Sequence, residues 1–164
     1  LGGARTSYRP CDHQPGNICR DPRGGQRNEV DRRSMGARLI LGIGTDLCKI
    51  SRVQRSLERF GARFAERILV GPELQRFFTH TKGAAYLAKR FAAKEAFSKA
   101  MGTGMRNPVL WSNLMVSNDA AGRPQIECLG ALGALVRERG VTAIHLSLTD
   151  EEDLASAFVV LERA

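Results

Sequence analysis

The sequence of 164 residues contains no apolar run long enough to cross a membrane. Its longest apolar runs, around residues 39–43 and 157–161, are far shorter than the roughly 20 residues that a spanning helix requires. The N-terminus also lacks the apolar core of a secretory signal peptide. These absences predict a soluble, cytoplasmic protein without membrane contact.

Cysteine is scarce and scattered, with residues Cys11, Cys19, Cys48 and Cys128. None of them forms a CxxC pair, so the sequence supports neither a disulfide framework nor a paired zinc site. This pattern favours a reducing compartment. A metal site built from Cys11, His13 and Cys19 stays open as an alternative, although these three ligands have no regular spacing.

Several motifs of nucleotide and hydrolase chemistry are also missing. The chain has no GxxxxGK[ST] sequence and no GxGxxG that opens a helix, so neither a P-loop nor a dinucleotide-binding domain is supported. None of the three histidines has a neighbourhood typical of a Ser-His-Asp hydrolase. The chemistry must therefore come from other residues.

Positive charge is abundant, since 25 Lys and Arg against 17 Asp and Glu give a net charge of +8. Such a surface suits an anionic partner: a nucleic acid, a nucleotide phosphate or an acidic protein. A basic stripe is predicted along one helix face if the helix continues in line beyond Gly61; its members are Arg52, Arg55, Arg59, Arg63 and Arg67. Aromatic residues make up only 6%, which gives a nucleic-acid-binding module little to stack bases on, and we keep it only as an alternative.

The first 34 residues differ in composition from the rest of the chain. Gly, Pro, Arg, Asp, Asn and Gln dominate them, and they offer almost no apolar side chain to a core. A patterned sequence begins at Met35. We expect residues 1–34 to be a disordered extension and residues 35–164 to form one domain. One explanation for the difference in composition is a natural start at Met35.

The pattern from residue 39 onward predicts an α+β fold, with a mostly antiparallel sheet packed on a long central helix. Residues 39–47 are expected to form a buried strand, in which glycines leave room where another backbone or a ligand comes close. Ser51 is expected to cap the next helix. The further elements predicted are a helix at 72–78, the central helix ending at Gly102, a strand–turn–strand at 114–128, a helix at 131–139, and strands at 141–149 and 155–161.

The central helix carries ionised residues among alanines. Glu95 and Lys99 lie four positions apart and share a helix face, so they could form an ordinary ion pair. A carboxylate in a buried helix could equally need a metal or a hydrogen-bond network. The helix ends at Gly102-Thr103-Gly104, where the glycines would let the backbone approach a ligand.

Two carboxylates stand out, Asp46 at a strand end and Glu95 in the central helix. Asp46 could be a simple turn residue. Without a Cys or His cluster, the two acids suit Mg²⁺, which takes one or two carboxylates and completes its shell with water and phosphate. Arg90, Lys94 and Lys99 are available to hold the remaining phosphate charge.

The segments Gly42-Ile43-Gly44-Thr45-Asp46-Leu47 and Arg90-Phe91-Ala92-Ala93-Lys94-Glu95-Ala96-Phe97-Ser98-Lys99-Ala100, followed by Gly102-Thr103-Gly104, closely resemble the bacterial holo-[acyl-carrier-protein] synthases. The resemblance extends from about Met35 to Arg163. It includes Arg63-Phe64-Ala65-Glu66-Arg67-Ile68-Leu69, Gly122-Arg123-Pro124 and His145-Leu146-Ser147-Leu148. Only residues 1–34 lie outside it.

The resemblance implies a 4′-phosphopantetheinyl transferase of fatty acid and lipid biosynthesis. A serine of apo acyl carrier protein attacks the β-phosphate of coenzyme A (CoA) and releases adenosine 3′,5′-bisphosphate. It further implies a homotrimer with active sites between subunits. Asp46 and Glu95 match the magnesium ligands, Lys99 matches a lysine near the reacting phosphate, and Glu95 is our candidate for the general base.

The same resemblance assigns binding residues. Those expected to meet the carrier protein are Arg52, Arg59, Arg63 and Phe64; those expected to bind CoA are Arg90, Lys94, Gly102, Thr103, Gly104 and His145. For His145, hydrogen bonds within the strand are an equal alternative to a phosphate contact. Two departures from the family pattern affect the surroundings of the site: Lys49 replaces an acidic residue and Asp150 replaces a second histidine. A CoA-binding protein without catalysis is a further alternative, disfavoured by the intact Asp46, Glu95 and Lys99.

Overall fold

The computed structural model describes residues 38–164, so the expectations for residues 1–34, including the alternative metal site, lie outside it. The elements follow the chain in the order β1 (Leu39–Lys49), α1 (Ile50–Phe60), α2 (Ala62–Glu66), α3 (Pro72–Thr79), α4 (Gly83–Ala100), η1 (Trp111–Asn113), β2 (Leu114–Asn118), β3 (Pro124–Cys128), α5 (Gly130–Glu138), β4 (Ala143–Glu151) and β5 (Leu154–Arg163). The predicted helices and strands are confirmed, with ends shifted by a few residues.

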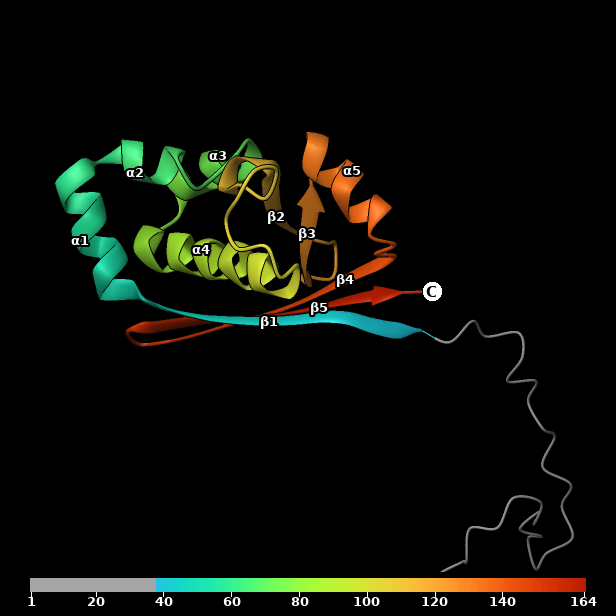
Figure 1. Cartoon of the computed structure of the whole chain (residues 1–164). Helices are drawn as coiled ribbons and strands as arrows, with labels where there is room; N and C mark the ends of the chain where they lie inside the picture. The colour runs from blue at the N-terminus through green and yellow to red at the C-terminus, as the bar shows by residue number, and fades with distance from the viewer. Residues whose placement is uncertain (1–37) are drawn as a thin grey trace, which may run out of the picture. The chain divides into compact units, whose positions relative to one another are not determined.

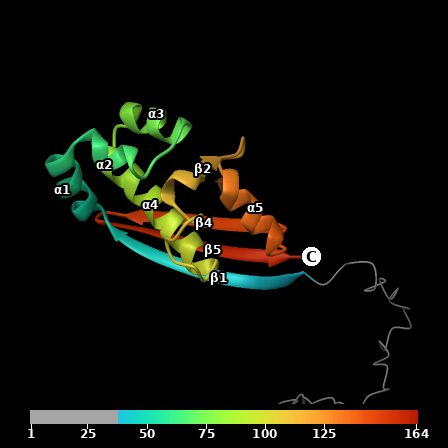
Figure 2. The same cartoon turned by 45° about the horizontal axis from the view of Figure 1, so that its top comes forward.

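The strands form two antiparallel sheets. One has three strands in the order β1-β5-β4, and the other is the β2-β3 hairpin. Helix α4 lies across one face of the three-stranded sheet, and α3, α5 and the hairpin lie beyond it on the same side (Figures 1 and 2). The α+β class and the predicted packing on a long central helix are therefore confirmed.

Helix α4 is the centre of the hydrophobic core, as its alanine-rich sequence predicts. Its buried alanines let the helix approach β1 and β5 closely, and the β5 residues that face it are themselves small or branched; the buried members are Ala88, Ala92, Ala93, Ala96 and Ala100 of α4 and Ala155, Ala157, Val159 and Leu161 of β5. Residues around the whole circumference of α4 are buried. The helix is thus a core element.

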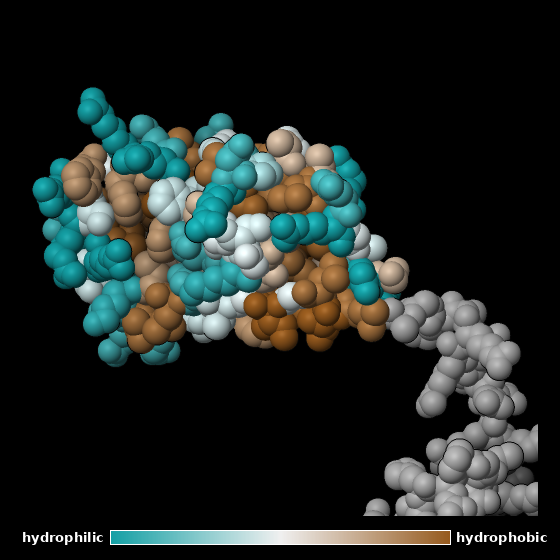
Figure 3. Space-filling view, in the orientation of Figure 1, coloured by the Kyte–Doolittle hydropathy of each residue, from teal (hydrophilic) through white to brown (hydrophobic). Residues whose placement is uncertain are grey.

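The prediction that β1 is buried is wrong for one of its faces. The sheet face turned away from α4 exposes Ile43 (56%), Leu47 (65%) and Phe158 (45%). Figure 3 shows hydrophobic residues gathered along the lower edge of the molecule, where β1 runs in Figure 1. The reason is that the helices cover only one side of this sheet, so the apolar side chains of the other side have no cover within the described part of the chain.

The cap of α1 also differs from the prediction. Ser51 does not cap the helix, which begins one residue earlier. Its backbone N–H instead donates to Asp153 Oδ1 at 2.8 Å, and the Ile50 N–H donates to the Asp153 carbonyl at 2.8 Å. Asp153 lies in the β4–β5 turn. An acceptor from a distant turn therefore replaces the local cap at this end of α1.

The basic stripe is interrupted because the helix does not continue in line. Gly61 closes α1 with φ 62°, and its N–H donates to the Leu57 carbonyl at 2.8 Å. Arg63 then belongs to the separate helix α2, and Arg67 follows its end. All five arginines are exposed, but they lie on two short helices and the loop after them.

Within residues 38–164, no helix is both long and apolar enough to span a membrane.

Candidate active site

The site is organised by the crossing of β1 and α4. A Cβ built on Gly44 would lie 2.0 Å from the Ala96 carbonyl oxygen, and one on Gly42 would lie 2.0 Å from the Ala100 carbonyl oxygen. Only glycine therefore allows the strand to run this close to the helix backbone. The predicted close approach of another backbone is confirmed, and that backbone is α4.

This crossing brings Lys99 of α4 to Asp46 of β1, and Glu95 lies one turn before Lys99 on the same helix. Asp46 follows Gly44 by two residues, and Glu95 precedes Ala96 by one. Lys99, one turn after Glu95, donates from Nζ to Asp46 Oδ1 at 2.8 Å and to the Thr45 carbonyl at 2.8 Å. The ion pair of Lys99 is thus with Asp46 on the neighbouring strand. It is not the pair within the helix that the spacing of Glu95 and Lys99 allowed.

Glu95 is half-buried, which is less than the buried position that we expected. Its Oε1 accepts a hydrogen bond from the indole Nε1–H of Trp111 at 2.9 Å. Sequence reasoning missed Trp111. The one available signal in the sequence was that Trp111 is the single tryptophan of the chain.

Each of the two carboxylates keeps one oxygen that could bind a magnesium ion. Within residues 38–164, Asp46 and Glu95 each use one carboxylate oxygen in a hydrogen bond to a side chain, Oδ1 to Lys99 and Oε1 to Trp111, and the second oxygen of each makes none. The described residues contain no cluster of three or more His, Cys, Asp and Glu side chains placed for a metal. Two carboxylates, with water and phosphate as further ligands, are a typical Mg²⁺ environment.

Lys94 does not belong to the site, which corrects the expectation that it holds phosphate. Its side chain is completely buried, and Nζ donates to Glu73 Oε2 at 2.8 Å and to the carbonyls of Ile68 and Trp111. Burial lowers the pKa of this ammonium, while the Glu73 carboxylate opposes that shift. The Glu73 carboxylate also accepts the backbone N–H groups of Val70 and Val116. Lys94 is therefore enclosed in a structural ion pair.

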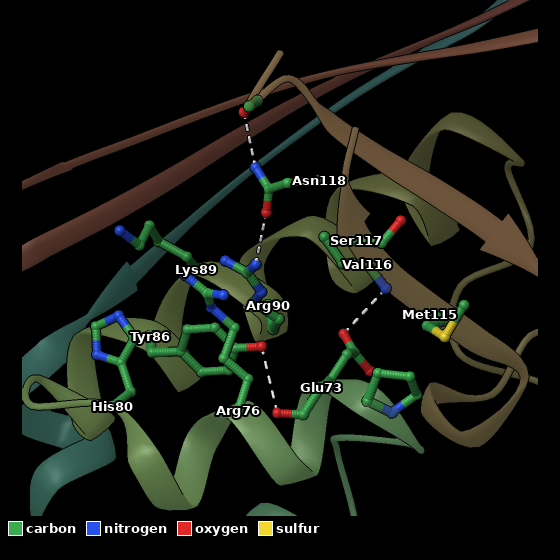
Figure 4. Close-up of a pocket in the computed structure, with 12 residues that line it drawn as sticks. Glu73, Arg76, His80, Tyr86, Lys89, Arg90, Met115, Val116, Ser117 and Asn118 are labelled. Atoms are coloured by element: carbon green, nitrogen blue, oxygen red, sulfur yellow. Dashed lines mark hydrogen bonds between the residues drawn. The ribbon is translucent and has the colours of Figure 1, made fainter. Parts of the chain in front are cut away.

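Arg90 lies in the wall of a pocket with a volume of about 480 Å³ (Figure 4). Its guanidinium stacks over the Tyr86 ring, with Cζ 4.2 Å from the centroid, and donates to Asn118 Oδ1 at 3.1 Å. Lys89 reaches the same pocket and pairs with Asp150 at 2.9 Å. Sequence reasoning identified Arg90 but missed the other lining residues, which include Arg76, His80, Tyr86, Lys89 and Asn118.

The glycine segment after α4 closes the helix as predicted. The Gly102 N–H donates to the Lys99 carbonyl at 2.9 Å and the Thr103 N–H donates to the Ser98 carbonyl at 3.3 Å, with Gly102 at φ 68°. This is the Schellman arrangement. Gly102 and Thr103 also line a separate hollow of about 380 Å³.

His145 lies away from these residues. It is on β4, in register with Val160 of β5, and its Nε2 is 3.0 Å from Glu162 Oε2. Its side chain is 55% exposed, and it lies on the sheet face that α4 does not cover. His145 therefore makes the hydrogen bond that the alternative expects, and its contact with CoA stays a prediction.

The expected carrier-binding residues are grouped at one end of the molecule. Arg52 and Arg59 are exposed on α1, Arg63 is exposed on α2, and Phe64 beside it is half-buried. Figure 3 shows hydrophilic residues concentrated over the α1 end. The structure therefore keeps these residues on neighbouring helices, although Gly61 breaks the single stripe.

Comparison with known proteins places this arrangement in a family. Residues 42–159 match the model of the 4′-phosphopantetheinyl transferase superfamily. A holo-[acyl-carrier-protein] synthase of Thiobacillus denitrificans is 52% identical over 126 residues, which cover 77% of this chain and 96% of that protein. The chain therefore belongs to the 4′-phosphopantetheinyl transferase superfamily.

Solved structures agree with this assignment. The crystal structure of holo-[acyl-carrier-protein] synthase from Neisseria meningitidis matches with a TM-score of 0.74 and 46% identity, covering 76% of this chain and all of that one. The holo-(acyl-carrier-protein) synthase from Bacillus anthracis, solved in complex with CoA (3′,5′-ADP), matches with a TM-score of 0.65 and 33% identity. It covers 76% of this chain and 98% of that one.

Proposed function

We propose that this protein transfers the 4′-phosphopantetheine group of CoA to a serine hydroxyl of apo acyl carrier protein. The observation that carries the proposal is the β1–α4 crossing, where Lys99, one helical turn after Glu95, pairs with Asp46 in a member of this superfamily. The serine oxygen forms a bond to the β-phosphorus, the bond from that phosphorus to the bridging oxygen breaks, and adenosine 3′,5′-bisphosphate leaves.

Each residue of the crossing has a task in this reaction. Asp46 and Glu95 would hold Mg²⁺, which when bound neutralises charge on the pyrophosphate. Lys99 is half-exposed and, among the described residues, pairs only with Asp46 and a carbonyl, so its ammonium can turn to a phosphate oxygen. The second oxygen of Glu95 is our candidate to accept the serine proton, directly or through water.

The basic pocket is the proposed seat of the adenosine 3′,5′-bisphosphate part of CoA. Arg76, Lys89 and Arg90 supply positive charge, and the Tyr86 ring supplies an apolar wall. The Arg90 Nε is buried and makes no hydrogen bond within residues 38–164. Such a buried donor is expected where a ligand oxygen accepts its hydrogen bond. Arg90 precedes Glu95 by about 7.5 Å along α4, so one extended molecule could reach both.

The carrier protein is proposed to dock on α1 and α2. An acidic helix of the carrier would meet Arg52, Arg59 and Arg63, with Phe64 supplying an apolar contact beside them. Charge complementarity of this kind raises the association rate and fixes orientation. This gives the basic surface a protein partner and removes the need for nucleic acid.

A homotrimer is the assembly that we propose. The uncovered sheet face carries Ile43, Leu47 and Phe158, all strongly exposed, and such a face is stabilised when copies of the chain cover it. His145 shares this face and could reach the site of a neighbouring copy.

The free thiols Cys48 and Cys128 suit a reducing cytoplasm. Residues 35–164 form the proposed catalytic domain.

The direct test uses purified protein with CoA, Mg²⁺ and an apo acyl carrier protein, followed by mass spectrometry of the carrier. We expect the carrier to gain one phosphopantetheine group on its serine, with release of adenosine 3′,5′-bisphosphate. An unchanged carrier mass with all components present would contradict the proposal. A salt-dependent mobility shift with nucleic acid tests the alternative, and we expect none at physiological salt.

A further inference from the structure

Trp111 contacts the face of α4 that carries Glu95. Its indole Nε1–H donates to Glu95 Oε1 at 2.9 Å. Its ring packs on Phe91, with centroids 5.6 Å apart and planes at 52°. Phe91 and Glu95 are four residues apart and share a helix face. The indole therefore lies along this face and meets the carboxylate with its polar edge.

The backbone of Trp111 is held at a second point. Its carbonyl oxygen accepts a hydrogen bond from Lys94 Nζ at 3.1 Å. That ammonium is fixed in turn by Glu73 Oε2 at 2.8 Å, in a pair that is completely buried. Two successive residues of α4 thus hold Trp111, Lys94 by its carbonyl and Glu95 by its side chain.

The chemistry of the indole suits it to orient a carboxylate. Its N–H is a donor only, so it cannot take up a proton or compete with Glu95 as a base. A hydrogen bond from a neutral donor to an ionised acceptor is stronger than one between neutral groups. A glutamate side chain has several free torsions, and fixing Oε1 leaves Oε2 in a defined direction.

We propose that Trp111 is a positioning residue, whose indole N–H holds the Glu95 carboxylate in its working orientation while the buried Glu73–Lys94 pair holds Trp111. This inference rests on the proposed transferase function. It gives the structural pair of Lys94 and Glu73 an indirect effect on the site, through the Trp111 carbonyl.

A purely structural role for the ring does not account for the arrangement. Trp111 is half-buried and lines a hollow of about 370 Å³ together with Arg67, Met105, Leu110 and Ser112. A ring that only filled the core would be enclosed by apolar side chains. Here one edge of the ring is used for the carboxylate and another part borders open space.

The test separates the N–H from the ring. Because Trp111 is the single tryptophan, benzothienylalanine can replace it selectively, exchanging the N–H for sulfur and keeping the bicyclic shape. Trp111→Phe is the simpler variant. We expect kcat to fall about 10- to 150-fold, as for loss of one hydrogen bond to a charged group, while the KM for CoA stays unchanged. Urea unfolding of each variant checks that the fold is retained.

Intrinsic fluorescence provides a readout independent of activity. Trp111 is the only source of tryptophan emission, so Glu95→Gln should change the emission of the folded protein in the absence of metal and substrate. Glu127→Gln is the matched control, because Glu127 is exposed on β3 and should leave the emission unchanged.

The outcomes are distinct. Unchanged emission in Glu95→Gln would show that the contact is absent in solution and would overturn the inference, even if the Trp111 variants failed to fold. An unchanged kcat in a folded variant without the N–H would overturn it as well. An inactive wild-type protein would refute the transferase function instead, whatever the variants do.

Discussion

Substituting Gly44 by alanine perturbs the crossing that builds the site. The new Cβ would lie 2.0 Å from the Ala96 carbonyl oxygen and 2.6 Å from the Ala100 nitrogen. The first distance is about 1.4 Å short of the 3.4 Å at which ordinary contact begins. Both atoms belong to the backbone of α4, so no side-chain rotation relieves the clash. The strand and the helix must move apart, and Asp46 must move with the strand.

Overpacking a core typically costs about 1–3 kcal/mol, and the rigid neighbours put Gly44→Ala near 3 kcal/mol. For a domain of this size that lowers the Tm by about 10 °C. A displacement of about 1 Å at Asp46 should also lower transfer by about 100-fold. The matched control is Gly83→Ala, whose Cβ meets only the edge of the Phe77 ring at 3.2 Å. Equal Tm and turnover for the two variants would refute the reasoning.

Three further predictions concern charge and protonation. Lys94→Met leaves the Glu73 carboxylate buried without its counterion, so urea unfolding should show a loss of about 3–5 kcal/mol; a loss below about 1 kcal/mol would contradict this. Burial raises the pKa of the Cys128 thiol from 9.0 to about 12, so the folded protein keeps a proton that the unfolded chain loses. Stability should therefore fall from pH 9 upward, and less steeply in Cys128→Ala. Arg52→Glu combined with Arg59→Glu should raise the KM for the carrier protein and leave CoA binding unchanged. An equal loss of CoA affinity would show that the assignment of these arginines to the carrier protein is wrong.

Local rules explain the parts of the site that the sequence predicts. Gly42 and Gly44 in an apolar strand indicate a close backbone, and Gly102 after a helical pattern indicates its end. Each inference needs only neighbouring residues. The structure confirms both, with α4 as the close backbone and a Schellman arrangement at Gly102.

The different roles of the three cationic side chains of α4 could not be predicted in the same way. Arg90, Lys94 and Lys99 lie on a helix that has alanine on every side, so periodicity does not tell which cation faces a cavity. Their roles depend on distant partners. Lys94 is enclosed because Glu73 of α3 reaches it, whereas Lys99 meets Asp46 of β1.

Other features escape local reasoning for the same reason. The helix α1 is capped by Asp153, about a hundred residues later, and Glu95 is held by Trp111 from η1. The exposure of Ile43 and Leu47 also could not be predicted from the sequence of a single chain. An apolar strand looks the same whether a helix of its own chain or another copy covers it.

The central claim is that Asp46 and Glu95 act together on one magnesium ion during phosphopantetheine transfer. It is tested most directly by Mg²⁺-dependent turnover of Asp46→Asn and Glu95→Gln, measured beside thermal unfolding of each variant. The account predicts that each substitution lowers turnover by orders of magnitude while the Tm stays near that of the wild-type protein. Near-normal turnover of Glu95→Gln at low Mg²⁺ would contradict both the metal assignment and the assignment of the base.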